Sequence, residues 1–246
     1  MIDWRQHLQV WRRAYGSVDA CAGWSITTQF VHLAGLLPLF PRGSHLVQLG
    51  GEPGHEVPVT LGLKSVAIGY CRVWGPLVTL GLALALTRGG LADGGGWTGA
   101  AWIGAAILAA AASVAAWALG GLSVDARAQR LAYARHAQYP VDVARLPGVH
   151  DLVWSRLHPH VSKRAAELAA ARHYPKTTSP EELWRDVAVD PLVTEAEFLS
   201  GALTLARIEW RLGSGAPRRR LADLHRAIWD NLRVADPTLL ETAARA

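Results

Sequence analysis

Two long apolar runs interrupt the mixed hydrophobic and polar pattern of this chain. They occupy residues 66–87 and 97–122, and a glycine-rich stretch separates them. A membrane-spanning helix needs about 20 apolar residues, because a rise of about 1.5 Å per residue must cover a hydrocarbon core of about 30 Å. Both runs meet this length, so the pattern predicts a transmembrane helical hairpin over residues 66–122.

The second run has no charged residue, and tryptophans stand near its two ends. Trp97 and Trp117 are twenty positions apart, which corresponds to about 30 Å of helix. Tryptophan side chains concentrate at the two membrane–water interfaces, at about this separation. We therefore expect both tryptophans to lie at lipid interfaces.

Small residues recur at close to four-residue spacing in the second run. Small side chains let the backbones of membrane helices approach each other closely. The first run can use part of this surface, and the remainder predicts a further membrane subunit or a second copy of the chain as partner. The expected helix-packing residues are Ala105, Ala109, Ala112 and Ala116.

Arginine placement predicts the orientation of the hairpin. Arginines lie on both flanks of residues 66–122, whereas the stretch between the two runs carries one arginine and one aspartate. By the positive-inside rule, both termini lie in the cytoplasm. Arg72 is the only charge inside the first run, and it either extends to the headgroups or contacts a partner helix or an anionic lipid.

Residues 3–15 fit a short amphipathic helix. Trp4 and Trp11 share one face of that helix, and Arg12 and Arg13 occupy others. A basic helix with this pattern is typical of a membrane interface, although packing on a soluble domain would explain it as well. With Arg72 and the two tryptophans of the second run, these four residues complete the set that we expect at the lipid interface.

Residues 26–65 carry weaker patterns. The apolar segment 26–40 is short for a membrane span, so we interpret it as an interfacial or re-entrant segment, or as a buried helix. Alternating apolar residues around a glycine-rich centre predict a small β-hairpin at 45–61. We assign residues 1–65 to a cytoplasmic or interfacial N-terminal region.

After Leu122 the chain becomes polar and helical in its periodicity. The fold class that we predict is an all-α membrane protein, with a two-helix transmembrane hairpin followed by a cytoplasmic helical domain at 123–246. In that domain the stripe of Leu203 and Ala206 predicts a core position for Trp210 and a more exposed one for Trp229. The expected helices cover 124–138, 149–157, 160–173, 180–188, 195–212, 218–234 and 237–244, with Pro159 interrupting the second and third.

The charge balance limits the partners of this domain. The whole chain carries a net charge of +5, and residues 123–246 contribute 18 − 15 = +3. Nucleic-acid-binding domains are usually more basic, so we expect no nucleic acid and instead anionic lipid headgroups or an acidic protein partner. The strongest basic cluster is Arg218, Arg219, Arg220 and Arg226, which is either a solvated ion-pair surface or a partner-binding one.

No sequence motif indicates catalysis. The two cysteines form no C-x-x-C pair, the histidines lack zinc-site spacing, and the nucleophile-elbow and phosphate-loop patterns are absent. We therefore assign no catalytic, cofactor-binding or metal-binding residue, and we expect no cofactor.

These features predict a non-catalytic subunit or adaptor of a bacterial envelope assembly, of the secretion, conjugation or cell-envelope kind, in the inner membrane. The low lysine and high arginine and alanine content is typical of a GC-rich bacterial genome. The alternative is a membrane-bound enzyme acting on a lipid or peptide. That enzyme would bring His32, His45, His55 and Arg72 together at the interface.

Overall fold

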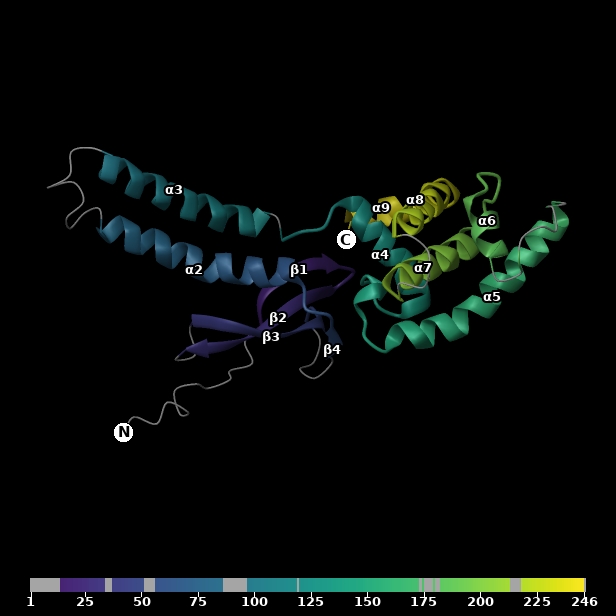
Figure 1. The fold of residues 1–246 in the computed structure, drawn as a ribbon, viewed down its shortest axis with the longest axis horizontal. Helices are drawn as coiled ribbons and strands as arrows, with labels where there is room; N and C mark the ends of the chain where they lie inside the picture. The colour runs from purple at the N-terminus through teal and green to yellow at the C-terminus, as the bar shows by residue number, and fades with distance from the viewer. Residues whose placement is uncertain are drawn as a thin grey trace, which may run out of the picture. The chain divides into compact units, whose positions relative to one another are not determined.

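The computed structural model describes residues 14–33, 37–50, 56–85, 97–118, 120–172, 174, 179, 182–212 and 218–245. The chain divides into two compact units, an N-terminal unit over residues 1–122 and a C-terminal unit over residues 123–246. The N-terminal unit combines a sheet with two long helices, whereas the described part of the C-terminal unit is helical (Figure 1).

The sheet of the N-terminal unit has four antiparallel strands in the order β1-β2-β3-β4. The strands are β1 (Ala14–Cys21), β2 (Trp24–Leu33), β3 (Leu37–Gln48) and β4 (Glu56–Val59). The predicted hairpin at 45–61 is confirmed, because Ser44 pairs with Val59 and Val47 with Glu56. It is one part of a larger sheet, so the fold class holds in part: the described structure is mostly helical, but with a small four-stranded antiparallel sheet it is not all-α.

Of the interpretations of residues 26–40, the buried helix is wrong. These residues supply most of β2 and the start of β3. Ile26, Phe30 and Val31 are β-branched or aromatic, and such residues favour strands when partner strands can cover them. Residues 3–13 of the expected amphipathic helix lie outside the described residues. Its last two residues, Ala14 and Tyr15, begin β1 instead.

The two apolar runs form α2 (Leu63–Ala85) and α3 (Trp97–Ala118), which pack against each other (Figure 1). Both helices are long and apolar enough to cross a membrane. The first half of α2 also packs on the sheet, where Ser65, Ile68 and Gly69 are buried. The second half has no such cover, and from Pro76 to Ala85 only Thr79 and Leu82 are partly shielded.

The described part of the C-terminal unit is built from helices and a short 3-10 turn. They are α4 (Val124–Ala137), η2 (Val143–Arg145), α5 (Val149–Ala171), α6 (Leu183–Val189), α7 (Ala196–Leu212), α8 (Arg218–Ala235) and α9 (Thr238–Arg245). The prediction of separate helices at 149–157 and 160–173 is wrong, since α5 continues through Pro159. The proline ring lies on the exposed side, while Val153 and Val161 are buried and hold the helix against the core.

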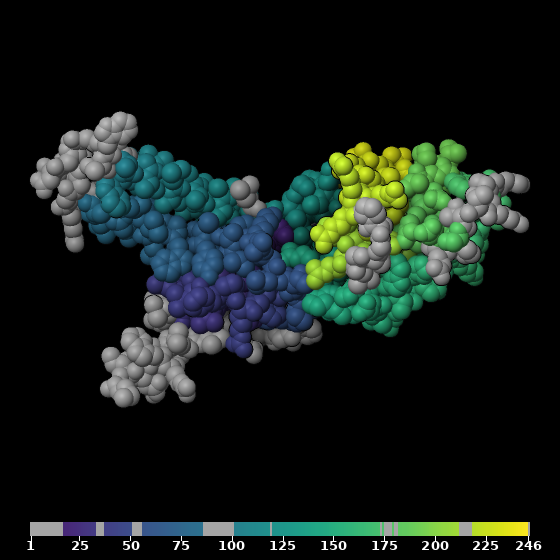
Figure 2. Space-filling view, viewed as in Figure 1, coloured from purple at the N-terminus to yellow at the C-terminus, as the bar shows by residue number. Residues whose placement is uncertain are grey.

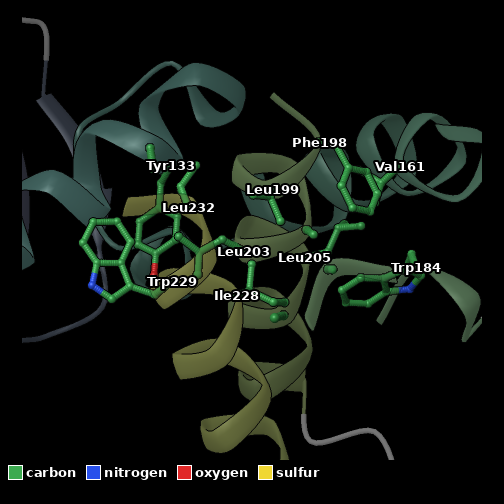
Figure 3. Close-up of a cluster of buried hydrophobic side chains, with 14 of the residues drawn as sticks. Tyr133, Val161, Trp184, Phe198, Leu199, Leu203, Leu205, Ile228, Trp229 and Leu232 are labelled. Carbon is green, nitrogen blue, oxygen red and sulfur yellow. The ribbon is translucent and has the colours of Figure 1, made fainter. Parts of the chain in front are cut away.

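The core of the C-terminal unit surrounds α7. Leu199, Leu203 and Ile208 of this helix are fully buried, and Figure 3 shows Leu199 and Leu203 between Trp229 on one side and Trp184 on the other. Both of these tryptophans are buried.

The expected ranking of Trp210 and Trp229 is wrong. Trp229 is 5% exposed, whereas Trp210 is only partly covered near the end of α7. The buried side of α8 is wide enough to include both Ile228 and its neighbour Trp229. The Trp210 ring instead lies under the Arg207 guanidinium, with 4.5 Å between the guanidinium carbon and the ring centroid.

Candidate functional site

A group of charged and aromatic residues joins both apolar helices to the sheet. We call Asp19, Lys64, Arg72 and Trp117 the basal clasp. Lys64 Nζ donates to Asp19 Oδ1 at 2.7 Å and to the Gly121 carbonyl at 3.0 Å. The Asp19 side chain is 6% exposed, and its backbone N–H donates to the Gly120 carbonyl at 2.8 Å. The end of α3 is thereby tied to β1 and to the start of α2.

Arg72 forms the second half of the clasp. Its guanidinium carbon lies 4.5 Å from the centroid of the Trp117 ring, and its Nη1 donates to the Ser17 carbonyl at 2.9 Å. A Cβ on Gly120 would come within 2.6 Å of Arg72 Nη2. A larger residue at position 120 would therefore displace the guanidinium from its place between α2, α3 and β1.

The basal clasp has the chemistry of a membrane-interface belt. Arginine and lysine extend to headgroups at the ends of membrane helices, and tryptophan prefers the same layer. Arg72 and Trp117, both expected at the lipid interface, are in contact here. Of the rest of that expected set, Trp4, Trp11, Arg12 and Arg13 lie outside the described residues, as does the side chain of Trp97.

The four alanines expected to pack between helices differ in their surroundings. Ala116 is 4% exposed, Ala105 and Ala109 are partly covered, and Ala112 is exposed. The surface of α3 used within the N-terminal unit therefore includes Ala116 but not Ala112.

The basic cluster of α8 is exposed. Arg218, Arg219 and Arg220 form the first turn of this helix. Arg226 lies 3.9 Å from Asp223, a weak surface pair. Arg226 also lines a cavity of about 460 Å³ together with Trp210 and Trp229. The sequence left Arg226 in a cluster that is either a solvated ion-pair surface or a partner-binding one, and Trp210 and Trp229 line the same cavity as Arg226.

Behind this cavity lies a polar group that the sequence did not reveal. Tyr133 Oη and His225 Nε2 are 2.7 Å apart. Arg207 Nε donates to Asp142 Oδ1 at 2.8 Å, and Arg207 Nη2 donates to Asp142 Oδ2. Asp142 and Arg207 are 65 positions apart, and Tyr133 and His225 are 92 positions apart. Sequence periodicity relates only near neighbours, so it could not predict these contacts.

Burial and charge determine the protonation of this group. Burial, with a smaller effect of the Arg207 charge, lowers the pKa of His225 to about 4. Burial raises the pKa of Tyr133. Burial alone would raise the pKa of Asp142, but hydrogen bonds and charge from Arg207 hold it below the usual value. At neutral pH the group is a neutral His–Tyr pair beside an ion pair.

This arrangement is suited to stabilising the fold and not to transferring a proton. Arg207 is occupied by Asp142 and covers Trp210. A general base should titrate near the working pH, and the pKa of His225 is far below neutrality. Two further arginines, Arg226 and Arg233, line the cavity together with the carboxylate of Asp125. Arg233 pairs with Asp230 at 3.0 Å, whereas Arg226 lies 3.9 Å from Asp223 and is the less constrained cation.

A serine and a histidine also meet in the C-terminal unit. His136 Nε2 lies 2.9 Å from Ser200 Oγ, and that hydroxyl donates to the Glu197 carbonyl at 2.9 Å. Since the hydroxyl proton is directed to the carbonyl, His136 acts as the donor. Ser200 is fully buried, which makes the pair a packing contact and not an activated nucleophile.

Two of the histidines of the enzyme hypothesis, His32 and His45, lie apart on the sheet. Strand register places His32 opposite Pro38 and His45 opposite Thr27. These positions are five residues apart along β2, about 16 Å. His55 lies outside the described residues. Within the described ranges, no three His, Cys, Asp or Glu side chains are grouped to hold a metal ion.

Comparisons of the chain with protein-family models, with curated proteins and with solved structures give no match.

Proposed function

We propose that the protein is a non-catalytic, membrane-anchored subunit or adaptor of a bacterial envelope assembly. The pair α2–α3 anchors it in the inner membrane, and both termini lie in the cytoplasm. The helical C-terminal unit docks a protein partner there. Within the membrane, a further subunit or a second copy covers part of α3, and anionic headgroups contact the basal clasp.

The observation that carries this proposal is the exposed apolar surface of the helix pair. Leu80 of α2 is 57% exposed, and Ile107 and Leu108 of α3 are 63% and 71% exposed. Figure 2 shows the blue and teal surfaces of the pair lying open along the face in view. Soluble proteins rarely expose contiguous apolar surface of this kind, whereas lipid requires it.

The charged residues around the pair support the same arrangement. Lys64 and Arg72 lie at the end of the pair that joins the sheet, beside Trp117. Positive residues favour the cytoplasmic side of a membrane. This end therefore faces the cytoplasm in our proposal, and the connection between α2 and α3 faces outward.

The docking role of the C-terminal unit rests on α8. This helix presents Arg218, Arg219 and Arg220 at its exposed start and Arg226 beside the cavity lined by two tryptophans. Tryptophan and arginine are the residues most enriched among strong contacts in protein interfaces. An acidic partner segment would complement this surface.

Membrane extraction tests the anchor. The full chain should remain in the membrane fraction after alkaline carbonate and high salt, and mild detergent should release it. Release by carbonate alone would show that the apolar pair does not insert in the bilayer.

Cysteine labelling in intact cells tests the orientation. In a background of Cys21→Ser and Cys71→Ser, a membrane-impermeant maleimide should label Gly95→Cys and spare Ala244→Cys. Labelling of Ala244→Cys in sealed cells would contradict the cytoplasmic C-terminus.

Native mass spectrometry in mild detergent tests the assembly role. The expected result is a species heavier than the 26.5 kDa single chain. If that species contains a different protein, Arg226→Glu should lower the fraction of the chain that carries it. A lone chain under all mild detergents tested would contradict an assembly subunit.

A further inference from the structure

The end of the β2–β3 hairpin runs alongside the middle of α2. Trp74 Nε1 donates to the Pro38 carbonyl at 3.0 Å, and the Tyr70 hydroxyl donates to the Leu39 carbonyl. The rings of Phe30 and Tyr70 meet edge to face, with 5.1 Å between centroids. Figure 1 shows the strands lying along the first half of α2. The sheet is therefore fastened to a helix that we place in the membrane.

The length of α2 makes this contact informative. From Pro76 to Ala85 the helix has ten residues, about 15 Å, which is half of a hydrocarbon core. The whole helix of 23 residues has the length of a span, but residues up to Trp74 lie beside the sheet. A bilayer that extends from Ala85 back to Tyr70 also reaches the sheet residues that are hydrogen-bonded to Tyr70 and Trp74.

The residues at this end of the sheet suit that position. Phe40 is 68% exposed on β3, and Val31, Leu37 and Leu39 are partly covered neighbours on the paired strands. Tyr70 and Trp74 beside them are the side chains that gather at membrane interfaces. Arg42 lies two residues after Phe40, and its positively charged side chain is exposed.

Polarity increases along the sheet away from this end. At the start of α2, the hydroxyls of Thr28, Ser44 and Ser65 form a buried hydrogen-bonded group, with oxygen separations of 2.9 and 2.6 Å. Lys64 pairs with Asp19 nearby. The strands beside the middle of α2 are thus apolar, whereas the buried contacts at its first turn are polar, although Leu61 and Leu63 are exposed there.

We infer that the apolar end of the sheet, formed by Val31, Leu37, Leu39 and Phe40, is a second membrane-contacting element, immersed in the interfacial layer of the cytoplasmic leaflet. The bilayer is the occupant of this surface, because the strand end is hydrogen-bonded to Trp74, three residues before the exposed apolar stretch that α2 presents from Leu77 onward. The inference rests on the proposed membrane anchor and adds the depth at which the unit sits. The sheet then fixes the tilt and depth of the helix pair.

Depth-dependent fluorescence quenching tests this inference. An environment-sensitive NBD dye is attached to single cysteines in the full chain, with Cys21→Ser and Cys71→Ser removing the native thiols. The sites are Phe40→Cys, Leu49→Cys as the matched control, and Ile107→Cys as the membrane reference. Leu49 is also exposed, at 56%, and lies nine residues beyond Phe40, about 30 Å of extended strand.

The labelled proteins are reconstituted in phosphatidylcholine–phosphatidylglycerol vesicles containing lipids with a doxyl quencher near the headgroup or deep in the acyl chain. We expect the shallow quencher to reduce the emission at position 40 at least twofold more than at position 49. Position 107 should respond most to the deep quencher. Circular dichroism of each labelled protein verifies the fold.

The outcomes separate this inference from the proposed function. Quenching at position 107 with equal responses at 40 and 49 would overturn the immersed sheet and leave the membrane anchor intact. Absence of quenching at 107 would refute the anchor, and the inference with it.

Discussion

Gly75 of α2 and Ser113 of α3 approach so closely that a side chain at position 75 has no room. A Cβ built on Gly75 would overlap Ser113 Oγ and lie 3.1 Å from Ser113 Cβ. The Ser113 hydroxyl donates to the Ala109 carbonyl of its own helix at 2.8 Å. The contact between the helices is therefore close packing of small residues, which is how membrane helices gain association energy.

Replacing Gly75 by alanine should force α2 and α3 apart. Overpacking of this kind costs about 1–3 kcal/mol, and thermal unfolding in mild detergent should show a lower midpoint. Gly81→Ala is the matched control, because a Cβ at position 81 meets nothing within 4 Å. Adding Ser113→Gly to Gly75→Ala should restore part of the loss. Equal midpoints for the two alanine variants would contradict the close approach.

Leucine at two alanines of α3 should have different effects. Ala116 is buried against the unit, so Ala116→Leu should destabilise the helix pair itself. Ala112 is exposed, so Ala112→Leu should keep the thermal midpoint and weaken association with a membrane partner. Thermal unfolding and native mass spectrometry in detergent measure the two effects. If Ala112→Leu leaves all associations unchanged, this side of α3 faces lipid only.

Trp229→Ala should destabilise the C-terminal unit more than Trp210→Ala. Removing a buried tryptophan costs about 3–5 kcal/mol, and Trp229 is 5% exposed. Trp210 contributes mainly its contact with Arg207, which is worth about 0.5–2 kcal/mol. Urea unfolding of the full chain in mild detergent, followed by far-UV circular dichroism, compares them. A larger loss for Trp210→Ala would contradict the core described here.

The stability of the C-terminal unit should fall as the pH drops from about 6.5 to about 4. Burial lowers the pKa of His225 from 6.5 to about 4, so in this window the unfolded chain binds a proton that the folded chain does not. The shift corresponds to about 3 kcal/mol when the window is fully crossed. The lowered pKa of His136, also caused mainly by burial, acts in the same direction.

His225→Gln should remove most of this dependence, although it also changes the contact with Tyr133. The measurement is the slope of unfolding free energy against pH, from urea titrations at several pH values between 4 and 7. Superimposable slopes for the variant and the natural chain would show that His225 is not the titrating group.

Local patterns were sufficient for most of the helices that the structure describes, but not for α5, which was expected as two helices. Apolar runs of about 20 residues predict α2 and α3, because the length and composition of one segment decide whether a helix can cross a membrane. The periodicity after Leu122 predicts α4, α7 and α8 to within a residue or two. These features depend on neighbours three or four positions apart, which a sequence displays directly.

Features that depend on distant partners were decided by the tertiary structure. The apolar composition of segment 26–40 is compatible with a strand and with a buried helix. The pairing of β2 with β1 and β3 decides for strands. The burial of Trp229 depends on how α8 is rotated against α7, because a difference of one position turns a helix by about 100°. The hydrogen bonds among Tyr133, Asp142, Arg207 and His225 also depend on tertiary packing, because their partners are far apart in the sequence. The sequence determined the apolar runs and most of the helices. Tertiary packing decided that β2 and the start of β3 are extended and which sides of the helices meet, since contact energies arise between residues that no local pattern connects.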